Sequence, residues 1–301
     1  MTIRFLFVLL LLASASTVLA EPAPPTASSA IRSLAPLGDA ARKRLDAIPN
    51  EGTPLPKQHY FRSNEWYQNL LVKPLDGRGG AYVGVGSDQN YTMAAIAGSE
   101  LLILIDYDPR IRWVHRIYDV LVRASETPAD LVSRFSEENA ESTRALIETA
   151  VTGDPYAAAI LKHFTKSRKL WHAYLKRVSG ESGKLEVTSW LSVPAYYAHM
   201  RALFNAGRVI SRNGDMTAER TVRAAGDTAR ELQIPVRIVY FSNAEQFFTY
   251  SDSFQANMRA LPTDKLSVVV RTIHHKGVPN AGPNDWHYVV QDMPDFLHRM
   301  A

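Results

Sequence analysis

The chain is organised around one glycine-rich stretch, Gly79-Gly80-Ala81-Tyr82-Val83-Gly84-Val85-Gly86-Ser87-Asp88-Gln89-Asn90. The apolar run 81–85 predicts a short buried strand, and Gly84 and Gly86 then allow a sharp turn without a Cβ atom facing a ligand. Ser87 or Asp88 is suited to cap a following helix over about 89–97. The stretch therefore predicts a strand, a glycine-rich turn and a helix in direct succession.

A second buried strand follows the helix. Gly98 is a typical helix terminator, and the apolar run 101–105 ends in Asp106, about 20 residues after the first loop glycine. A strand, a glycine-rich turn, a helix, a second strand and a terminal acid make up the nucleotide-binding half of a Rossmann-like fold. In that fold the helix N-terminus receives the polar end of the ligand and the acid binds ribose hydroxyls.

The composition is that of an ordinary soluble protein. The 301 residues are 46% hydrophobic and 21% charged, which is enough apolar material for a sizeable core. Lysine and arginine exceed aspartate and glutamate by only 34 − 30 = 4 and are scattered along the chain, so we expect no nucleic-acid binding. The chain has no cysteine, which excludes disulfides, thiolate metal sites and a cysteine nucleophile. The histidines show no metal-ligand spacing, and we predict no metal site.

The first 20 residues have the pattern of a cleaved signal peptide. Arg4 provides a positive charge, 5–12 is an apolar run, and Ala20 precedes a cleavage point before Glu21. The apolar run is shorter than the roughly 20 residues that a membrane span requires. We therefore expect export to the periplasm or the extracellular space, with no membrane association after cleavage. The Pro-, Ala- and Ser-rich residues 21–30 predict a disordered tether.

Residues 31–301 are interpreted as a single Rossmann-like α/β domain with a mostly parallel sheet and a helical insertion over about 110–206. Helix-period apolar residues fill the insertion, and no linker bounds it. The connection between the last two predicted strands is rich in Gly and Pro and holds no helix, so these strands should pair antiparallel at the sheet edge. After the insertion we expect a strand near 208–211, a helix over 218–232 capped by Thr217, a strand over 236–241, a helix through 258, strands over 266–272 and 285–291, and a helix over 293–300.

Polar residues follow the predicted strands in chain order. Each has a simple structural explanation as a turn or a helix cap. Ligands of open α/β sheets bind outside the carboxyl ends of the strands, so the set as a whole predicts one shared cleft. Its members are Gly84, Gly86, Asp88 and Asn90 after the first strand, Asp106 after the second, Asp215 near the third, and Ser242, Asn243 and Glu245 after the fourth.

This arrangement resembles the class I S-adenosylmethionine-dependent methyltransferases over roughly residues 79–108 and 208–291. Val83-Gly84-Val85-Gly86 matches the Gly-x-Gly core of their first motif, although Tyr82 stands where that motif usually has an acid. The resemblance implies that Asp106 binds ribose and that Asp215 lies by the adenine. It also implies that Asn243, followed by Phe247, belongs to the motif after the fourth strand.

The chain also resembles a group of exported bacterial proteins that share Gly-Val-Gly-x-x-Gln-Asn and Ser-Asn-x-Glu motifs and have no established activity. We therefore expect an exported methyltransferase-like protein that binds S-adenosylmethionine or a related small-molecule nucleoside and uses Asn243 and Glu245 as catalytic residues. Glu65 and His287 are further candidates for a base. Because S-adenosylmethionine is a cytoplasmic metabolite, the alternative is an exported, non-catalytic binding or structural module. The sequence predicts no oligomeric state.

Two further expectations concern the ligand. A carboxylate at Asp88, beside the helix N-terminus, would repel a pyrophosphate, which favours S-adenosylmethionine over NAD. Replacement of Asp106 by alanine should weaken nucleoside binding and leave folding little affected.

Overall fold

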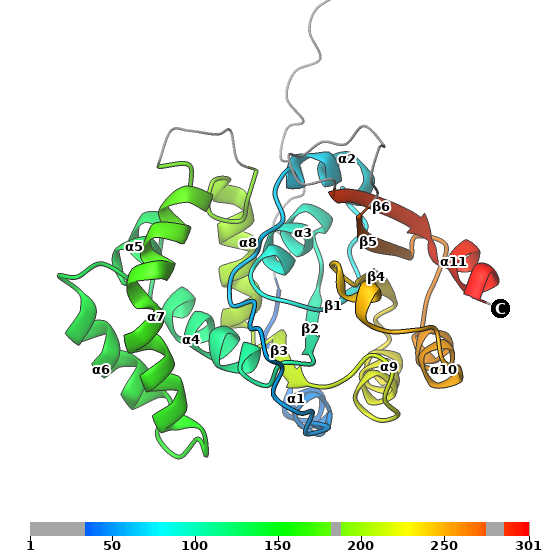
Figure 1. The fold of residues 1–301 in the computed structure, drawn as a ribbon, viewed down its shortest axis with the longest axis horizontal. Helices are drawn as coiled ribbons and strands as arrows, with labels where there is room; N and C mark the ends of the chain where they lie inside the picture. Colours follow the sequence, from blue (N-terminus) through cyan, green and yellow to red (C-terminus); the bar gives the residue numbers. More distant parts are fainter. Residues whose placement is uncertain (1–33, 182–187, 275–285, 301) are drawn as a thin grey trace, which may run out of the picture. The chain divides into compact units, whose positions relative to one another are not determined.

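The computed structural model describes residues 34–181, 188–274 and 286–300 (Figure 1). The predicted signal peptide and tether lie outside these residues. The described strands form one six-stranded sheet in the order β3-β2-β1-β4-β5-β6. Its members are β1 Ala81–Gly84, β2 Leu101–Asp106, β3 Val209–Asn213, β4 Val236–Tyr240, β5 Val268–His274 and β6 Trp286–Asp292.

The sheet is parallel from β3 to β5 and ends in an antiparallel pair. Val270 of β5 is paired with Val290 of β6 in antiparallel register, whereas the other neighbouring strands are parallel. The connection between β5 and β6 lies outside the described residues. The mixed α/β class, the mostly parallel Rossmann-like sheet and the antiparallel edge are thus confirmed. The strand order reverses beside β1, and this reversal marks the position where ligands bind in such sheets.

Helices cover both faces of the sheet, because side chains alternate along each strand. In β1, Tyr82 belongs to one buried cluster and Val83 to the other. Tyr82 faces the short helices before β1 together with α3 to α8, and Val83 faces the layer of α1 and α9 to α11. The bounds are α1 Asp39–Asp46, η1 Gln68–Leu71, α2 Val72–Leu75, α3 Gln89–Ala97, α9 Thr221–Glu231, η2 Ala244–Phe247, α10 Asp252–Ala260 and α11 Met293–Met300.

The segment between β2 and β3 is helical, as predicted. Figure 1 shows α6 and α7 on the side of α4 away from the sheet. One continuous buried cluster joins Leu102 of β2 to Trp171 of α7, so these helices share the core of the sheet. The bounds are α4 Ile111–Arg123, α5 Pro128–Ser133, α6 Ala140–Ala150, α7 Ala157–Val178 and α8 Pro194–Asn205.

Two predicted helix caps are wrong. Helix α3 has the expected bounds and ends at Gly98, which adopts the left-handed conformation with φ 63°. Asp88 occupies the N-cap position of α3, but its side chain makes no capping hydrogen bond. Helix α9 begins at Thr221, so Thr217 does not cap it. Instead the Thr217 hydroxyl donates to Asp215. In both cases the polar side chain forms its hydrogen bond with a residue outside the helix that it was expected to cap.

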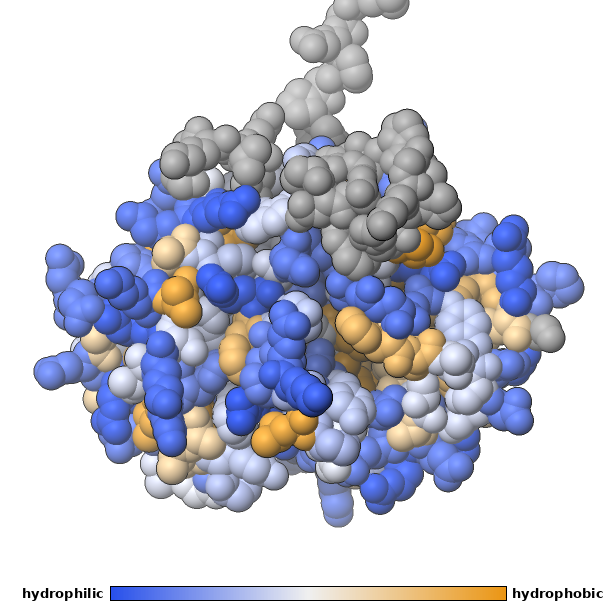
Figure 2. All heavy atoms as spheres, viewed as in Figure 1, coloured by the Kyte–Doolittle hydropathy of each residue, from blue (hydrophilic) through white to orange (hydrophobic). Residues whose placement is uncertain are grey.

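The described surface is polar on the face shown in Figure 2, where hydrophilic residues predominate and apolar residues form separate patches. Exposed large apolar side chains come from distant parts of the chain, such as Leu55, Leu170 and Phe247. Such scattered exposure is normal for a folded protein. Among the described helices, none combines the length and the apolar character that crossing a bilayer requires.

Candidate functional site

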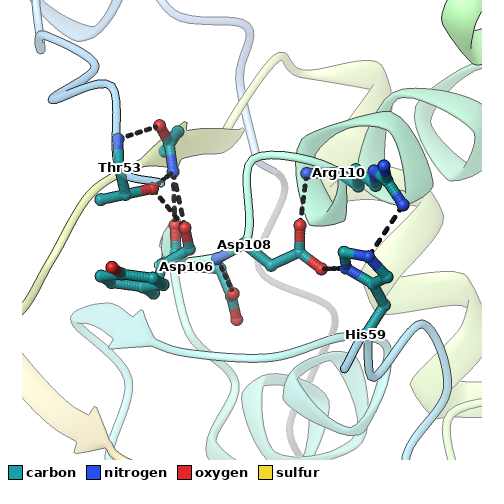
Figure 3. Close-up of polar contacts among 7 residues, drawn as sticks. Thr53, His59, Asp106, Asp108 and Arg110 are labelled. Carbon is teal, nitrogen blue, oxygen red and sulfur yellow. Dashed lines mark hydrogen bonds and ion pairs between the residues drawn. The ribbon is translucent and has the colours of Figure 1, made fainter. Parts of the chain in front are cut away.

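A segment before β1 crosses the carboxyl ends of the strands, which a local sequence pattern could not predict. We call residues 49–66 the crossing segment. At β3 the backbone N–H of Thr53 donates to Asn213 Oδ1 at 3.1 Å, and Asn213 Nδ2 donates back to Thr53 Oγ1 at 2.6 Å (Figure 3). Asn213 Nδ2 also donates to the carbonyl of Asp106 at 3.1 Å. The crossing segment therefore lies directly against the edge where a ligand is expected.

The loop after β1, residues 84–90, is held together from inside by Asn90. Its Nδ2 donates to the carbonyls of Val85 and Ser87 at 2.9 and 2.7 Å, and its Oδ1 accepts from the Tyr82 hydroxyl at 2.9 Å. Asn90 is fully buried, so the structure assigns it to the loop rather than to the ligand surface. We call residues 84–90 the glycine loop.

The two glycines are needed for reasons internal to this loop. A Cβ atom on Gly84 would lie 2.3 Å from Asn90 Oδ1 and 2.5 Å from the Tyr82 ring. Gly86 has φ 90°, a conformation that residues with a side chain rarely adopt. Position 84 therefore requires glycine because it packs closely against Asn90 and Tyr82, and not because a ligand needs open space there.

Asp106 joins the end of β2 to the glycine loop. Its Oδ2 accepts from the backbone N–H of Gly86 at 2.8 Å. Its Oδ1 accepts from the N–H of Asp108 at 2.7 Å (Figure 3). Burial raises the pKa of this carboxyl to about 6, although both hydrogen bonds act in the opposite direction. Because Asp106 satisfies two backbone donors, its removal should destabilise the fold, contrary to the expectation from sequence.

His115 of α4 supports the other side of the glycine loop. Its Nε2 lies 3.0 Å from the carbonyl of Gly86 and its Nδ1 lies 2.5 Å from the Tyr91 hydroxyl. A carbonyl can only accept, so Nε2 carries the hydrogen and Nδ1 accepts from Tyr91. Burial lowers the pKa of His115 to about 4 and keeps the ring neutral at pH 7. Asp106 and His115 thus hold the N–H and the carbonyl of the same residue, Gly86.

Asp88 faces the helical layer rather than the sheet edge. Its carboxylate accepts from the Tyr174 hydroxyl at 2.9 Å and from Trp190 Nε1 at 3.2 Å, and the residue is 1% exposed. Burial raises the pKa of Asp88. With the carboxylate turned to these two partners, the expectation that Asp88 repels a pyrophosphate loses its geometric basis.

A second acid after β2, Asp108, forms a polar group with His59 of the crossing segment. His59 Nδ1 lies 2.5 Å from Asp108 Oδ2, and Arg110 Nη1 donates to His59 Nε2 at 2.8 Å (Figure 3). Since Nε2 accepts, the hydrogen is on Nδ1 and is donated to Asp108. The spacing Asp106-Tyr107-Asp108 was the one sequence signal for this group, which we did not predict.

The third predicted acid, Asp215, lies in the turn after β3. Its Oδ1 accepts from the N–H and the hydroxyl of Thr217, each at 2.7 Å. The preceding residue, Gly214, donates its N–H to the carbonyl of Asp106 at 3.0 Å. The ends of β2 and β3 are therefore joined, which brings the turn of Asp215 next to Asp106.

The residues after β4 form a separate polar group. Ser242 adopts φ 53°, and its hydroxyl donates to the carboxylate of Glu65. Glu245 is held by Arg271, whose Nε donates to it at 2.6 Å, and by the Tyr250 hydroxyl. The Asn243 side chain makes no hydrogen bond within the described ranges. Ser242 and Glu245 therefore point to different partners.

Glu65, which the sequence suggested only as a further candidate base, has a central place in this group. Its carboxylate accepts from Tyr240 at 2.5 Å and from Thr272 at 2.8 Å, as well as from Ser242. Glu65 is 9% exposed, and burial raises its pKa despite these hydroxyl donors. The crossing segment thus places a buried carboxyl at the ends of β4 and β5. In the part of the chain that the structure describes, no group of His, Asp and Glu side chains could hold a metal ion.

The fold and the glycine loop define a Rossmann-like α/β protein. The chain belongs to the family described as "Domain of unknown function (DUF7790)", whose model matches residues 60–301. Among solved structures it is similar to the rRNA methyltransferase aviRa from Streptomyces viridochromogenes, with 12% identity, 90% of this chain and 99% of that chain covered, and a TM-score of 0.34. A likeness this weak carries no information about activity. No curated protein matches the chain.

Proposed function

We propose that this is an exported, methyltransferase-like protein that binds S-adenosylmethionine or a related nucleoside at the carboxyl ends of β1 and β2. One observation carries the proposal. The Gly86 N–H donates to Asp106 Oδ2 at 2.8 Å, so the glycine loop and the acid after β2 are joined beside the reversal of strand order. This is the place where Rossmann-like sheets bind the ribose and the polar end of a nucleoside ligand.

The residues present fit such a ligand. A carboxylate has about four lone-pair positions, and the two backbone N–H groups use one on each oxygen of Asp106. Asp106 is partly exposed, and each of its oxygens keeps a lone-pair position that a ribose hydroxyl could use. Asp215, in the turn joined to Asp106, is the residue proposed to lie by the base of the nucleoside. Neither proposed contact requires a change in the sheet.

When bound, S-adenosylmethionine would supply an electrophilic methyl group. The chain's contribution would lie after β4, where the Asn243 side chain has no partner among the described residues and is free to orient an acceptor. Glu245 would take up the proton from that acceptor, with Arg271 stabilising its charged form at 2.6 Å.

A non-catalytic module is the second candidate, and a specific observation favours it. Asp106, Asp88 and Asn90 all satisfy groups of the protein itself, so the polar residues that resemble a ligand site also explain the stability of the glycine loop. An exported protein that retained the fold for binding or structure would need these same contacts.

Thermal unfolding with and without ligands tests the proposal. We expect 1 mM S-adenosylhomocysteine to raise the Tm of the mature protein, because a ligand at about 100 times its Kd adds about 2.7 kcal/mol to the free energy of unfolding. NAD at the same concentration is the comparison ligand. The variant Asp106→Asn should reduce the shift, whereas Asp227→Asn, in an exposed ion pair with Arg230, should keep it. No shift in the wild type with either nucleoside would reject the proposed ligand.

A further inference from the structure

The turn after β4 holds a serine–carboxylate pair that takes no part in the proposed nucleoside site at the ends of β1 and β2, although Asn243 of the same turn is the residue proposed above to orient a methyl acceptor. We propose that Ser242 and Glu65 form a nucleophile–base pair for acyl transfer from small carboxylic esters. The pair brings together residues 177 positions apart in the chain, and it stands at the carboxyl end of the sheet, where catalytic groups of α/β proteins lie.

The backbone at Ser242 is the first support. Ser242 lies between β4 and η2, so it is part of a turn from a strand into a helix. Its φ of 53° is in the left-handed region, which a residue with a side chain adopts only when its surroundings impose it. In serine hydrolases built on α/β sheets, a strained strand-to-helix turn of this kind presents the nucleophile.

The hydrogen bonds to Glu65 are the second support. Tyr240 and Thr272 both donate to Oε2, at 2.5 and 2.8 Å, whereas Ser242 donates to Oε1. One carboxylate oxygen is therefore fixed by two neutral donors and the other faces the serine hydroxyl. Burial raises the pKa of Glu65 and so increases its affinity for the serine proton. A nucleophile, a base in hydrogen-bond contact and groups that orient the base are the parts that such a site requires.

The third support is a group able to stabilise a developing oxyanion. The backbone N–H of the residue after the nucleophile commonly takes this role. Here that residue is Asn243, whose backbone N–H donates to no acceptor within residues 34–181, 188–274 and 286–300. Its side-chain amide is likewise without a partner in the same ranges.

The step balances without a further reactant. Ser242 Oγ attacks the ester carbonyl carbon as its proton passes to Glu65 Oε1. The bond from that carbon to the alcohol oxygen breaks, and Glu65 returns the proton to the departing alkoxide. Water then hydrolyses the acyl-serine, with Glu65 again accepting and returning one proton. Ser242 is only 9% exposed, so an acyl group that reaches its hydroxyl must be small.

Labelling with a small fluorophosphonate tests the pair. We expect one adduct on the wild-type protein by intact mass, and peptide mapping should place it on Ser242. Ser242→Ala should abolish the adduct, Glu65→Gln should slow labelling at least about 100-fold, and Ser142→Ala, on the exposed face of α6, should label like the wild type. The absence of an adduct on folded wild-type protein, or an adduct at another residue, would overturn the proposal.

The pH dependence separates catalysis from a merely structural contact. The rate of wild-type labelling should fall as the pH decreases through the pKa of Glu65, above the ordinary value of 4.5. The measurement does not need the Glu65 variant to fold. A labelling rate that is independent of pH would show that Glu65 only anchors the crossing segment and would reject its role as base. Nucleoside binding is measured separately, by the change of Tm with ligand. Failure of the labelling test therefore leaves the proposed nucleoside site untouched.

Discussion

Asn90→Ala should open the glycine loop, because one side chain makes three of the hydrogen bonds that shape it. The variant removes donors from the carbonyls of Val85 and Ser87 and the acceptor of the Tyr82 hydroxyl. Each such bond contributes about 1 kcal/mol, and all three groups are buried, so we expect a loss of about 3 kcal/mol in the free energy of unfolding. For a domain of this size the loss corresponds to a decrease in Tm of about 6–12 °C.

Calorimetric or circular-dichroism melting measures this decrease. Asn205→Ala is the matched control, because Asn205 is exposed at the end of α8 and such substitutions stay within about 0.5 kcal/mol. A double-mutant cycle of Asn90→Ala with Tyr82→Phe should give a coupling energy of about 1 kcal/mol. If Asn90→Ala lowered the Tm no more than Asn205→Ala, the assignment of Asn90 as the organiser of the loop would be wrong.

Three further predictions concern ionisation and processing. The raised pKa of Asp106 means that its ionisation opposes folding, so the free energy of unfolding should fall by up to about 3 kcal/mol as the pH rises from about 4 to about 6; urea titrations should show this contribution reduced in Asp106→Asn. The ionisation of His115 acts in the opposite direction on stability. Because its pKa is lowered, the free energy of unfolding should decrease as the pH falls from about 6.5 to about 4. At pH 7 nitrogen NMR should show its hydrogen on Nε2, and a hydrogen on Nδ1 would contradict the bond to Gly86. Intact-mass analysis of exported protein should find a chain that begins at Glu21, and a retained Met1 would reject the predicted cleavage.

The part of the fold that the sequence predicted best is the part governed by local rules. The continuous apolar run of β2 and the terminator Gly98 of α3 placed Asp106 at a strand end. The capping box of α5 is equally readable from the sequence, since Thr127 and Asp130 bond to each other's backbone N–H. Signals of this kind involve residues only a few positions apart, so they can be read without knowledge of the fold.

The polar partners were not predictable, because they depend on contacts between distant segments. Asp88 accepts hydrogen bonds from Tyr174 and Trp190, which lie 86 and 102 residues away, and these bonds replace the predicted cap of α3. Glu65 reaches β4 and β5, at Tyr240 and Thr272, over 175 and 207 residues. No periodicity or spacing rule relates such positions, since their proximity follows from the path of the crossing segment over the sheet edge.

Isothermal titration calorimetry of S-adenosylhomocysteine into the mature protein tests the nucleoside site most directly. We predict saturable heat with one site per chain and affinity that weakens below about pH 6 as Asp106 takes up a proton, with NAD titrated for comparison. Asp106→Asn should weaken binding at least 10-fold, equivalent to about 1.4 kcal/mol, with its folding checked by melting. Absence of heat with both nucleosides at millimolar concentration, for protein that melts cooperatively, would contradict a nucleoside site at the ends of β1 and β2.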